Sequence, residues 1–513
     1  MNKQAMPHNN MGNNTGNITV IPAQAGTHAT QGRFEGWVPA CAGMTARARM
    51  ARVGSGALLA ALVLAGCTNL APRHERPASP IPAQLPLSAD AAASASANAA
   101  VPLGWKAFVQ SPQLAQLVQR ALDQNRDLRV AVLNVQRAEA QLGVARADRL
   151  PTVSAGLIGS ATPNAASGRQ VQSYTAGVQV TAWELDLFGR IANLGEAAQA
   201  QVLATEAGRR SAELALVSAV VSGWLTLGAD AELLSVADRT LASRTSTLKL
   251  SQLRFDAGAA SALELQTAQS LIAQARNTQA QLRRQREQDL NALALLVGGP
   301  VPAELLPGAS AAPTAAADPG VLAPVPVGLA SDVLLQRPDV IQAEQSLVAA
   351  NANIGVARAA FFPRLALTGS AGQAGSRLSD LFQAGNFAWT LSAQALVAIF
   401  DSGRNQANLN VAKVNRDIAV AQYEKAVQSA FRETADALAG LSSWREQLDA
   451  QGQQRDAARE IARLTELRYT NGAASELDRL DAQRSLLAAE QTLVQTRLAE
   501  QVNRVGLFKA LGG

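Results

Sequence analysis

Apolar residues recur at two different spacings along the chain, and the two spacings predict two kinds of element. Segments with a helical spacing predict helices, and a segment that also lacks proline predicts a long one. The segment from Gly189 to Phe255 would be about 100 Å long if it were helical throughout. The expected helices cover residues 114–149 (one helix or a pair), 189–255, 262–297, 331–360, 403–467 and a last segment that ends near 511.

Other segments have the alternation that is typical of β-strands. From Ser173 to Trp183 apolar and polar residues alternate, so one face of a strand would be apolar. From Phe387 to Phe400 the same alternation places Trp389, Ile399 and every second residue between them on one face. The expected strands form two hairpins and cover about residues 152–160, 173–183, 364–372 and 387–400, with 161–172 as the first loop.

The second half of the chain repeats the first. Leu142–Ala147 (LGVARA) returns 212 residues later as Ile354–Ala359 (IGVARA), and Leu253–Ser261 (LRFDAGAAS) returns 214 residues later as Leu467–Ser475 (LRYTNGAAS). A period this long excludes a solenoid and indicates a duplicated half-protein. The expected halves cover residues 103–299 and 331–511, with a linker at 300–330.

Composition narrows the possible chemistry. The formal net charge is +5, but residues 1–66 hold five cations and one anion and so account for +4 of it. A nucleic-acid partner is therefore not expected. The histidines are His8, His28 and His74 and the cysteines are Cys41 and Cys67, a set without metal-ligand spacing or a His-based triad. We expect no enzyme activity, no cofactor and no metal.

A short apolar run near the N-terminus predicts a processed signal. A basic region opens at Met50, and the apolar residues 57–64 that follow are too few to span a bilayer. They lead into Leu64-Ala65-Gly66-Cys67, which looks like a bacterial lipobox with Cys67 as the acylated residue. The alternative is an ordinary secretory signal with an incidental cysteine.

The same signal divides the N-terminal region into three parts. Residues 1–66 are leader and signal, and because the signal begins at Met50, we hypothesise that residues 1–49 are not translated in the native protein. Residues 67–102 are rich in Pro, Ala and Ser. They predict a tether between the lipid and the folded body.

Two hairpins supply only four strands per chain. Four strands cannot close a barrel, and open sheet edges are not tolerated in lipid. We therefore expect several copies to share one barrel, with 8 strands from two copies or 12 from three. The alternative is a small water-soluble sheet that caps a helical bundle. The lipobox and the strand lengths, which are near the spanning length, favour the membrane.

The duplicated helix–hairpin–long-helix order resembles the TolC/OprM-like outer-membrane factor family over about residues 103–511. The resemblance also rests on Trp183–Arg190 (WELDLFGR), on Leu334–Asp339 (LLQRPD) and on the paired Arg-aromatic-X-X-Gly turns. The lipobox is similar to that of the lipoprotein branch, the NodT-like outer-membrane lipoproteins of RND efflux pumps.

This resemblance implies a homotrimer in which a 12-strand outer-membrane β-barrel joins a periplasmic α-helical barrel. It implies outer-membrane lipid, a periplasmic adaptor protein and, through the adaptor, an inner-membrane RND transporter as partners. The implied function is the outer-membrane channel of a tripartite efflux pump. Two alternatives stay open, a periplasmic coiled-coil scaffold lipoprotein and an outer-membrane duct for type I protein secretion.

The turns after the two long helices are candidate functional sites, because both helices should end at the periplasmic side. Gly258 and Gly472 would permit the tight reversals. The resemblance implies that this tip contacts the adaptor, with Arg254 and Phe255 in the first turn. The plain alternative is that the turns only connect helices.

Two acidic residues follow the second turn. Asp478 and Asp481 lie three apart and so share a helix face. In a trimer they would form a ring of six carboxylates at the periplasmic aperture. This negative charge suits a constriction that attracts cations. Arg468 and Tyr469 would add inter-helix bonds that hold the aperture shut. The alternative for the aspartates is solvated surface charge.

Overall fold

The computed structural model describes residues 69–85, 104–163, 168–308, 320–325, 330–383 and 385–513. All of them belong to one compact unit, residues 65–513. The leader and the lipidation candidate Cys67 lie outside the described residues.

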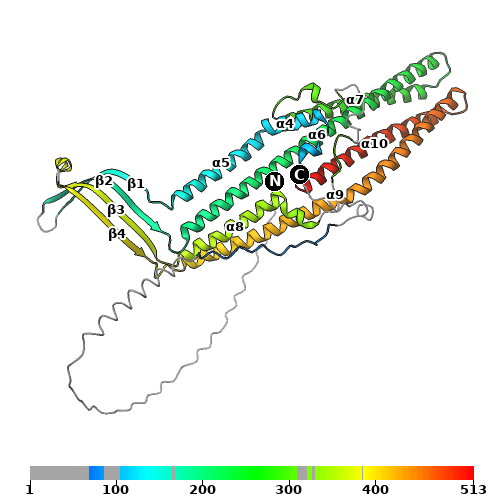
Figure 1. Cartoon of the computed structure of the whole chain (residues 1–513). Coiled ribbons are helices and arrows are strands. Elements are labelled where there is room, and N and C mark those ends of the chain that lie inside the picture. The colour runs from blue at the N-terminus through cyan, green and yellow to red at the C-terminus, as the bar shows by residue number, and fades with distance from the viewer. Residues whose placement is uncertain (1–68, 86–103, 164–167, 309–319, 326–329, 384) are drawn as a thin grey trace, which may run out of the picture. The chain divides into compact units, whose positions relative to one another are not determined.

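The fold is mainly helical, and the predicted order of helix, hairpin and long helix occurs once in each half (Figure 1). The two longest helices, α6 and α9, have 67 residues each, which corresponds to about 100 Å. The α-helices are α3 (Trp105–Phe108), α4 (Pro112–Gln124), α5 (Arg126–Ala147), α6 (Arg190–Asp256), α7 (Ala262–Val297), α8 (Pro338–Ala359), α9 (Arg404–Thr470) and α10 (Glu476–Ala510). The 3-10 helices are η1 (Ala303–Leu305), η2 (Ser331–Gln336) and η3 (Leu378–Phe382).

Two helix boundaries have local causes, and one of them differs from the sequence prediction. The first segment is a pair, because Asn125 is extended (ψ 132°) and its side chain caps α5 by accepting a hydrogen bond from the Leu128 amide. The predicted single helix at 331–360 is wrong at its start. Arg337 is extended (ψ 139°) because Pro338 disfavours the helical conformation of the residue before it, so η2 and α8 are separate.

The strands form one antiparallel sheet in the order β1-β2-β3-β4. Both hairpins are confirmed, and the second strand of the first hairpin pairs directly with the first strand of the second. The outer strands β1 and β4 each have one neighbour in this sheet. The strands are β1 (Val153–Pro163), β2 (Gln170–Leu185), β3 (Arg364–Gly375) and β4 (Phe387–Leu396).

Two strand predictions need correction. β2 has a bulge between Val180 and Trp183, so Trp183 replaces Ala182 on the face of Val180. β4 ends at Leu396 rather than at Phe400, because its last partner is Arg364, the first residue of β3. The loop predicted at 161–172 is shorter, because both strands of the first hairpin extend until Pro163 pairs with Gln170.

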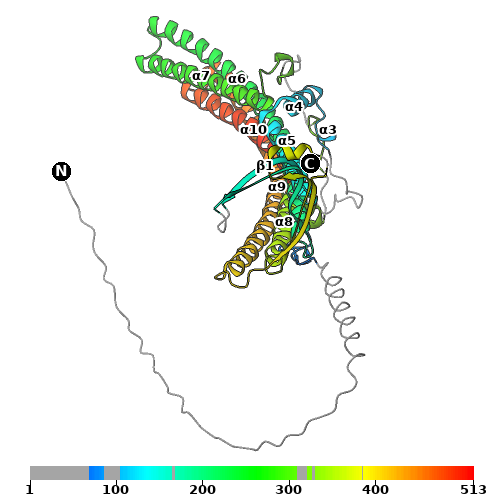
Figure 2. The same cartoon turned by 90° about the vertical axis from the view of Figure 1, so that its left-hand side faces the viewer.

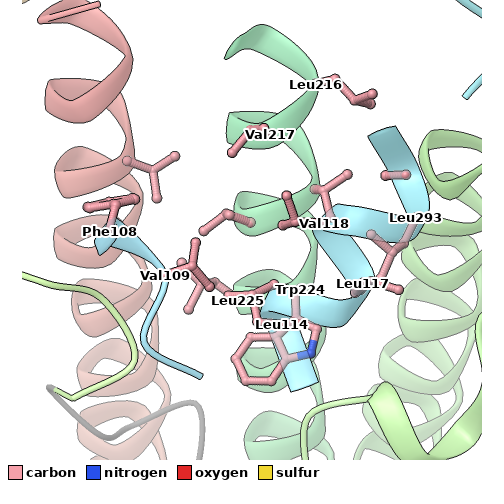
Figure 3. Packing of buried hydrophobic residues seen from close by; sticks show 14 of the residues in the cluster. Phe108, Val109, Leu114, Leu117, Val118, Leu216, Val217, Trp224, Leu225 and Leu293 are labelled. Carbon is pink, nitrogen blue, oxygen red and sulfur yellow. The ribbon is translucent and has the colours of Figure 1, made fainter. Parts of the chain in front are cut away.

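The main hydrophobic core lies where α4, α6, α7 and α10 meet (Figure 3). Trp224 of α6 is fully buried, and its indole nitrogen donates to the carbonyl of Leu305 at 2.9 Å. Phe108 stacks on Phe508 with ring centroids 4.2 Å apart. This packing explains why α6, which is long and apolar enough to cross a membrane, serves as a core helix with 56% of its most apolar window buried.

The helices continue the order of the strands. α5 packs on α6, α6 on α8, and α8 on α9, so α5 and α9 are the outer members of this layer as β1 and β4 are of the sheet. The hairpin partners α7 and α10 pack on α6 and α9, and α10 also contacts α6 (Figure 2). The two helical hairpins thus lie side by side.

The segment 69–85, predicted as part of a flexible tether, is instead bound to the folded body. The guanidinium of Arg76 donates two hydrogen bonds to Glu344 of α8, at 2.8 and 2.9 Å. Arg358 donates to the carbonyl of Leu70 at 2.9 Å, and Leu85 is buried in a second core cluster. Composition alone did not reveal these contacts, because each depends on a single residue within a Pro- and Ala-rich segment.

A buried carboxyl group lies between α6 and α7. Asp230 is 6% exposed, and its Oδ2 atom has no hydrogen-bond partner among the described residues. Burial, together with the nearby carboxyl of Asp289, raises the pKa of Asp230 to about 7 against the opposing effect of the positive charge of Arg286. The folded protein therefore holds a proton that the unfolded chain releases near pH 4.

We expect this group to make the folded state less stable as the pH rises from about 4 to about 7, because over that range folding must take up a proton that the unfolded chain has released. Asp230→Asn should remove that part of the pH dependence and raise the melting temperature at pH 8 by roughly 1–3 °C relative to the wild type. Asp449→Asn, an exposed site on α9, should do neither. Parallel pH dependence of melting in the wild type and Asp230→Asn would contradict this assignment.

Candidate functional site

The two helix turns have the same backbone geometry. Gly258 and Gly472 both have a φ of 74°, in the left-handed region that glycine adopts without strain. In each turn the amide that follows the glycine donates to a carbonyl five residues earlier, from Ala259 to Arg254 and from Ala473 to Arg468, both at 2.7 Å. This is the Schellman pattern of helix ends. The tight reversals predicted for both glycines are observed.

One hydrogen bond joins the two turns directly. The guanidinium of Arg254, at the end of α6, donates to the hydroxyl of Tyr469, at the end of α9, at 2.8 Å. Arg468 donates instead to the carbonyl of Ala473 within its own turn, at 3.1 Å. The structure therefore gives Tyr469 an inter-helix bond and gives Arg468 a local one. Both turns lie at the same end of the helices (Figure 1).

The N-terminus of α10 is capped more completely than that of α7. Ser261 accepts a hydrogen bond from the Glu264 amide at 3.2 Å, but the reciprocal bond is present only in the second half. There the Asp478 carboxylate accepts from the amide and the hydroxyl of Ser475, at 3.0 and 2.8 Å. These bonds lower the pKa of Asp478, so its carboxylate stays ionised at neutral pH.

A buried arginine supports the same turn. Arg479 is 7% exposed and donates two hydrogen bonds to Glu476, at 2.9 and 2.5 Å. It also donates to Thr247 of α6 at 3.3 Å and lies 4.9 Å from the centre of the Tyr469 ring. Arg479 therefore connects α6, α9 and α10.

Comparison with known proteins identifies this architecture. The chain matches the outer membrane efflux protein family over residues 117–299 and 329–513. It is 41% identical over 460 residues to the probable efflux pump outer membrane protein TtgC of Pseudomonas putida, which covers 88% of this chain and 94% of the relative. It is 38% identical over 459 residues to the cation efflux system protein CusC of Escherichia coli, with 88% and 97% covered.

A solved structure agrees with these relatives. The open state of the Neisseria gonorrhoeae MtrE outer membrane channel superposes with a TM-score of 0.77 at 36% identity, covering 87% of this chain and 98% of MtrE. The chain belongs to the outer membrane efflux protein family. It is an outer-membrane channel component of an efflux pump, and the function and cellular location implied by the sequence are confirmed.

Within this efflux channel protein, the structure does not join the two aspartates to each other. The carboxylate of Asp478 bonds back to Ser475, whereas that of Asp481 bonds to Arg484. Asp481 is half exposed, so its charge can reach an aqueous lumen. The ring of carboxylates would need further copies of the chain and stays a prediction.

The sequence analysis missed Arg479. Its counterpart in the first half, 214 residues earlier, is the buried Leu265. A charged residue in one half at a position that is apolar in the other half is the signal that could have revealed Arg479. In the predicted turn, Phe255 is partly exposed beside Arg254. Its contact with an adaptor remains a prediction.

Metal binding has no candidate cluster in this structure. The described residues contain no group of three or more His, Cys, Asp or Glu side chains placed to hold an ion.

The positive φ of Gly472 gives a test of the turn. Gly472→Ala should destabilise the turn by about 1 kcal/mol, because an alanine in the left-handed region is strained. Gly452→Ala is the matched control, since Gly452 lies within α9 with nothing within 4 Å of an added Cβ. It should leave the turn unchanged and strengthen α9 slightly.

Hydrogen–deuterium exchange of peptides that span 465–480 reports the difference. We expect faster exchange in Gly472→Ala and wild-type exchange in Gly452→Ala. Equal exchange in the two variants would show that the left-handed glycine does not hold the turn.

Proposed function

We propose that three copies of this chain close one duct through the outer membrane and the periplasm, and that the paired turns form its periplasmic aperture. The observation that carries the proposal is the pair of sheet edges, β1 and β4, which have no second neighbour among the described residues. Backbone groups in lipid must be hydrogen-bonded, so each edge requires another copy. β1 and β4 run antiparallel to each other, so an edge-to-edge ring would remain antiparallel throughout.

Three copies fit a duct better than two. An 8-strand barrel has an interior that side chains fill, whereas a 12-strand barrel is wider. The helix layer has matching outer members, since α5 exposes Val130 and Leu133 while α9 exposes Val411, Val414 and Ile418. In a ring, the apolar stripe of α9 would cover that of α5 in the next copy.

The position of the first described residues supports the proposal that Cys67 carries a lipid. Asn69 lies against Gly189, which is the residue that precedes α6 near the end of β2. A lipid two residues before Asn69 would therefore attach close to the junction of sheet and helices. Exposed apolar residues gather near this junction, as expected at a membrane interface. They are Leu150, Phe361, Phe362, Ile399 and Phe400.

The paired turns are the part of each protomer farthest along the helices from the strands, and we assign them to the adaptor contact. Arg254, Phe255, Gly258 and Gly472 would meet a periplasmic adaptor protein, which would connect the channel to an inner-membrane RND transporter. The exposed Phe255 supports this assignment, as do the small residues that follow the two glycines, Ala259 and Ala260 in the first turn and Ala473 and Ala474 in the second. The names of the relatives range from toluene efflux to cation efflux, so they do not define the cargo of this chain.

We further propose that Asp478 and Asp481 line the aperture while the Arg254–Tyr469 bond holds the turns together at rest. Asp478→Asn with Asp481→Asn should remove six negative charges from the trimer and keep an acceptor for Ser475. In planar bilayers, cation selectivity and block by divalent cations should fall several-fold.

Asp449→Asn with Asp456→Asn is the control. It removes the same number of charges from α9, away from the turns, and should leave block by divalent cations close to that of the wild type. If the aperture variant keeps wild-type selectivity and block, the two aspartates are only surface charges and caps.

The lipid anchor has a separate test. Wild-type cells grown with labelled palmitate should yield labelled protein, because Cys67 would carry the acyl chains. Cys67→Ser should lose the label, and Cys41→Ser should keep it because Cys41 lies in the predicted leader. Label that persists in Cys67→Ser would contradict the assignment of this cysteine.

A further inference from the structure

A groove between three helices lies next to the turns. α6 forms one side of it through Thr240 and Arg244, α7 contributes Leu271 and Gln274, and α10 contributes Leu480. Its volume is about 350 Å³, within the range of pockets that take small molecules. The wall combines leucines with hydroxyl and amide groups.

Arg244 is the unusual member of this groove. It is 7% exposed, and the structure gives it neither a hydrogen bond nor an ion pair to any described residue. Its Nη1 atom is fully buried without a partner. A buried cation without a partner is strongly unfavourable, so an anion is expected beside it.

The acids near Arg244 are already engaged. Glu476 is paired with Arg479, and Asp481 is paired with Arg484. Burial lowers the pKa of Arg244, and the positive charges of Arg479 and Arg484 lower it further despite Glu476. The groove therefore has excess positive charge at its buried end.

The other buried arginines show how this chain satisfies such groups. Among the described residues only Arg337 and Arg479 are buried to a similar extent. Arg337 bonds to Asp339, Glu433 and the carbonyl of Ala510, and Arg479 bonds to Glu476. Arg244 differs from both because none of the described residues pairs with it.

We infer that this groove binds a small organic anion, with its acidic group on Arg244 and its apolar part against the leucines of α7 and α10. The carboxylate or sulfonate would accept from the guanidinium of Arg244, which lines the groove, and Thr240 and Gln274 would supply further hydrogen bonds. A neutral molecule of the same shape would leave Arg244 unpaired. Asp481 and Arg484 also line the groove and pair with each other, so the groove shares Asp481 with the proposed aperture, but the anion is assigned to Arg244.

Binding of hexanoate and of hexanamide to the full-length protein tests this directly. The two probes have the same apolar chain, but only hexanoate is charged at neutral pH. Calorimetric titration of protein in nanodiscs, with empty nanodiscs subtracted, should give a dissociation constant for hexanoate in the millimolar range and binding about tenfold weaker for hexanamide.

Two variants place the binding in the groove. Arg244→Gln should remove the preference for hexanoate, whereas Arg210→Gln, an exposed arginine on the same helix, should keep it. Leu480→Phe, which fills the groove but leaves Arg244 in place, should weaken binding of both probes.

Three results would overturn the proposal. They are equal binding of the two probes by the wild type, unchanged hexanoate binding in Arg244→Gln, and no hexanoate binding by the wild type. The last result together with a loss of assembly in Arg244→Gln would mean that a carboxylate of another copy pairs with Arg244. If Arg244→Gln does not fold, loss of hexanoate binding in folded Leu480→Phe supports the site and unchanged binding overturns it.

Discussion

The structure depends on one constraint, the need of every backbone group in the sheet for a hydrogen-bond partner. β1 and β4 each have one edge that no other described strand pairs with. In water such an edge would be hydrated, but in lipid each unpaired group costs several kcal/mol. The helices follow the same order as the strands, so among the described helices α5 and α9 are the outer members of their layer. Association with further copies satisfies both edges at once, and a pore through the assembly follows from it.

Duplication gives the protein two similar turns that have diverged in charge. The backbones at Gly258 and Gly472 have the same φ, and the same hydrogen bonds close both turns. The side chains that follow differ, since the buried Leu265 of the first half corresponds to Arg479 in the second. The first half supplies Arg254 to the shared bond, and the second supplies Tyr469 and the acids. The two turns therefore act as unequal parts of one tip.

The pattern of residues was sufficient to predict the long helices and both hairpins, because residues 189–255 contain no proline and two of the strands alternate between apolar and polar residues. It failed where a neighbour in space decides the boundary. β4 ends at Leu396 because β3 begins at Arg364, and no local feature of the sequence marks that position. The segment with Arg76 has the composition of a tether, yet Glu344 binds it from 268 residues away. Arg244 could not be recognised either, because a missing partner is visible only when the surrounding helices are in place.

The number of chains in the channel tests the central claim most directly. Native mass spectrometry of the purified protein, released from detergent micelles, counts the copies without assuming a structure. The account predicts a mass three times that of the mature chain, stable until the detergent is removed or the sample is heated. A monomer that stays soluble without detergent would contradict it, because the edges of β1 and β4 would then be hydrated by water and would need no pairing with other copies.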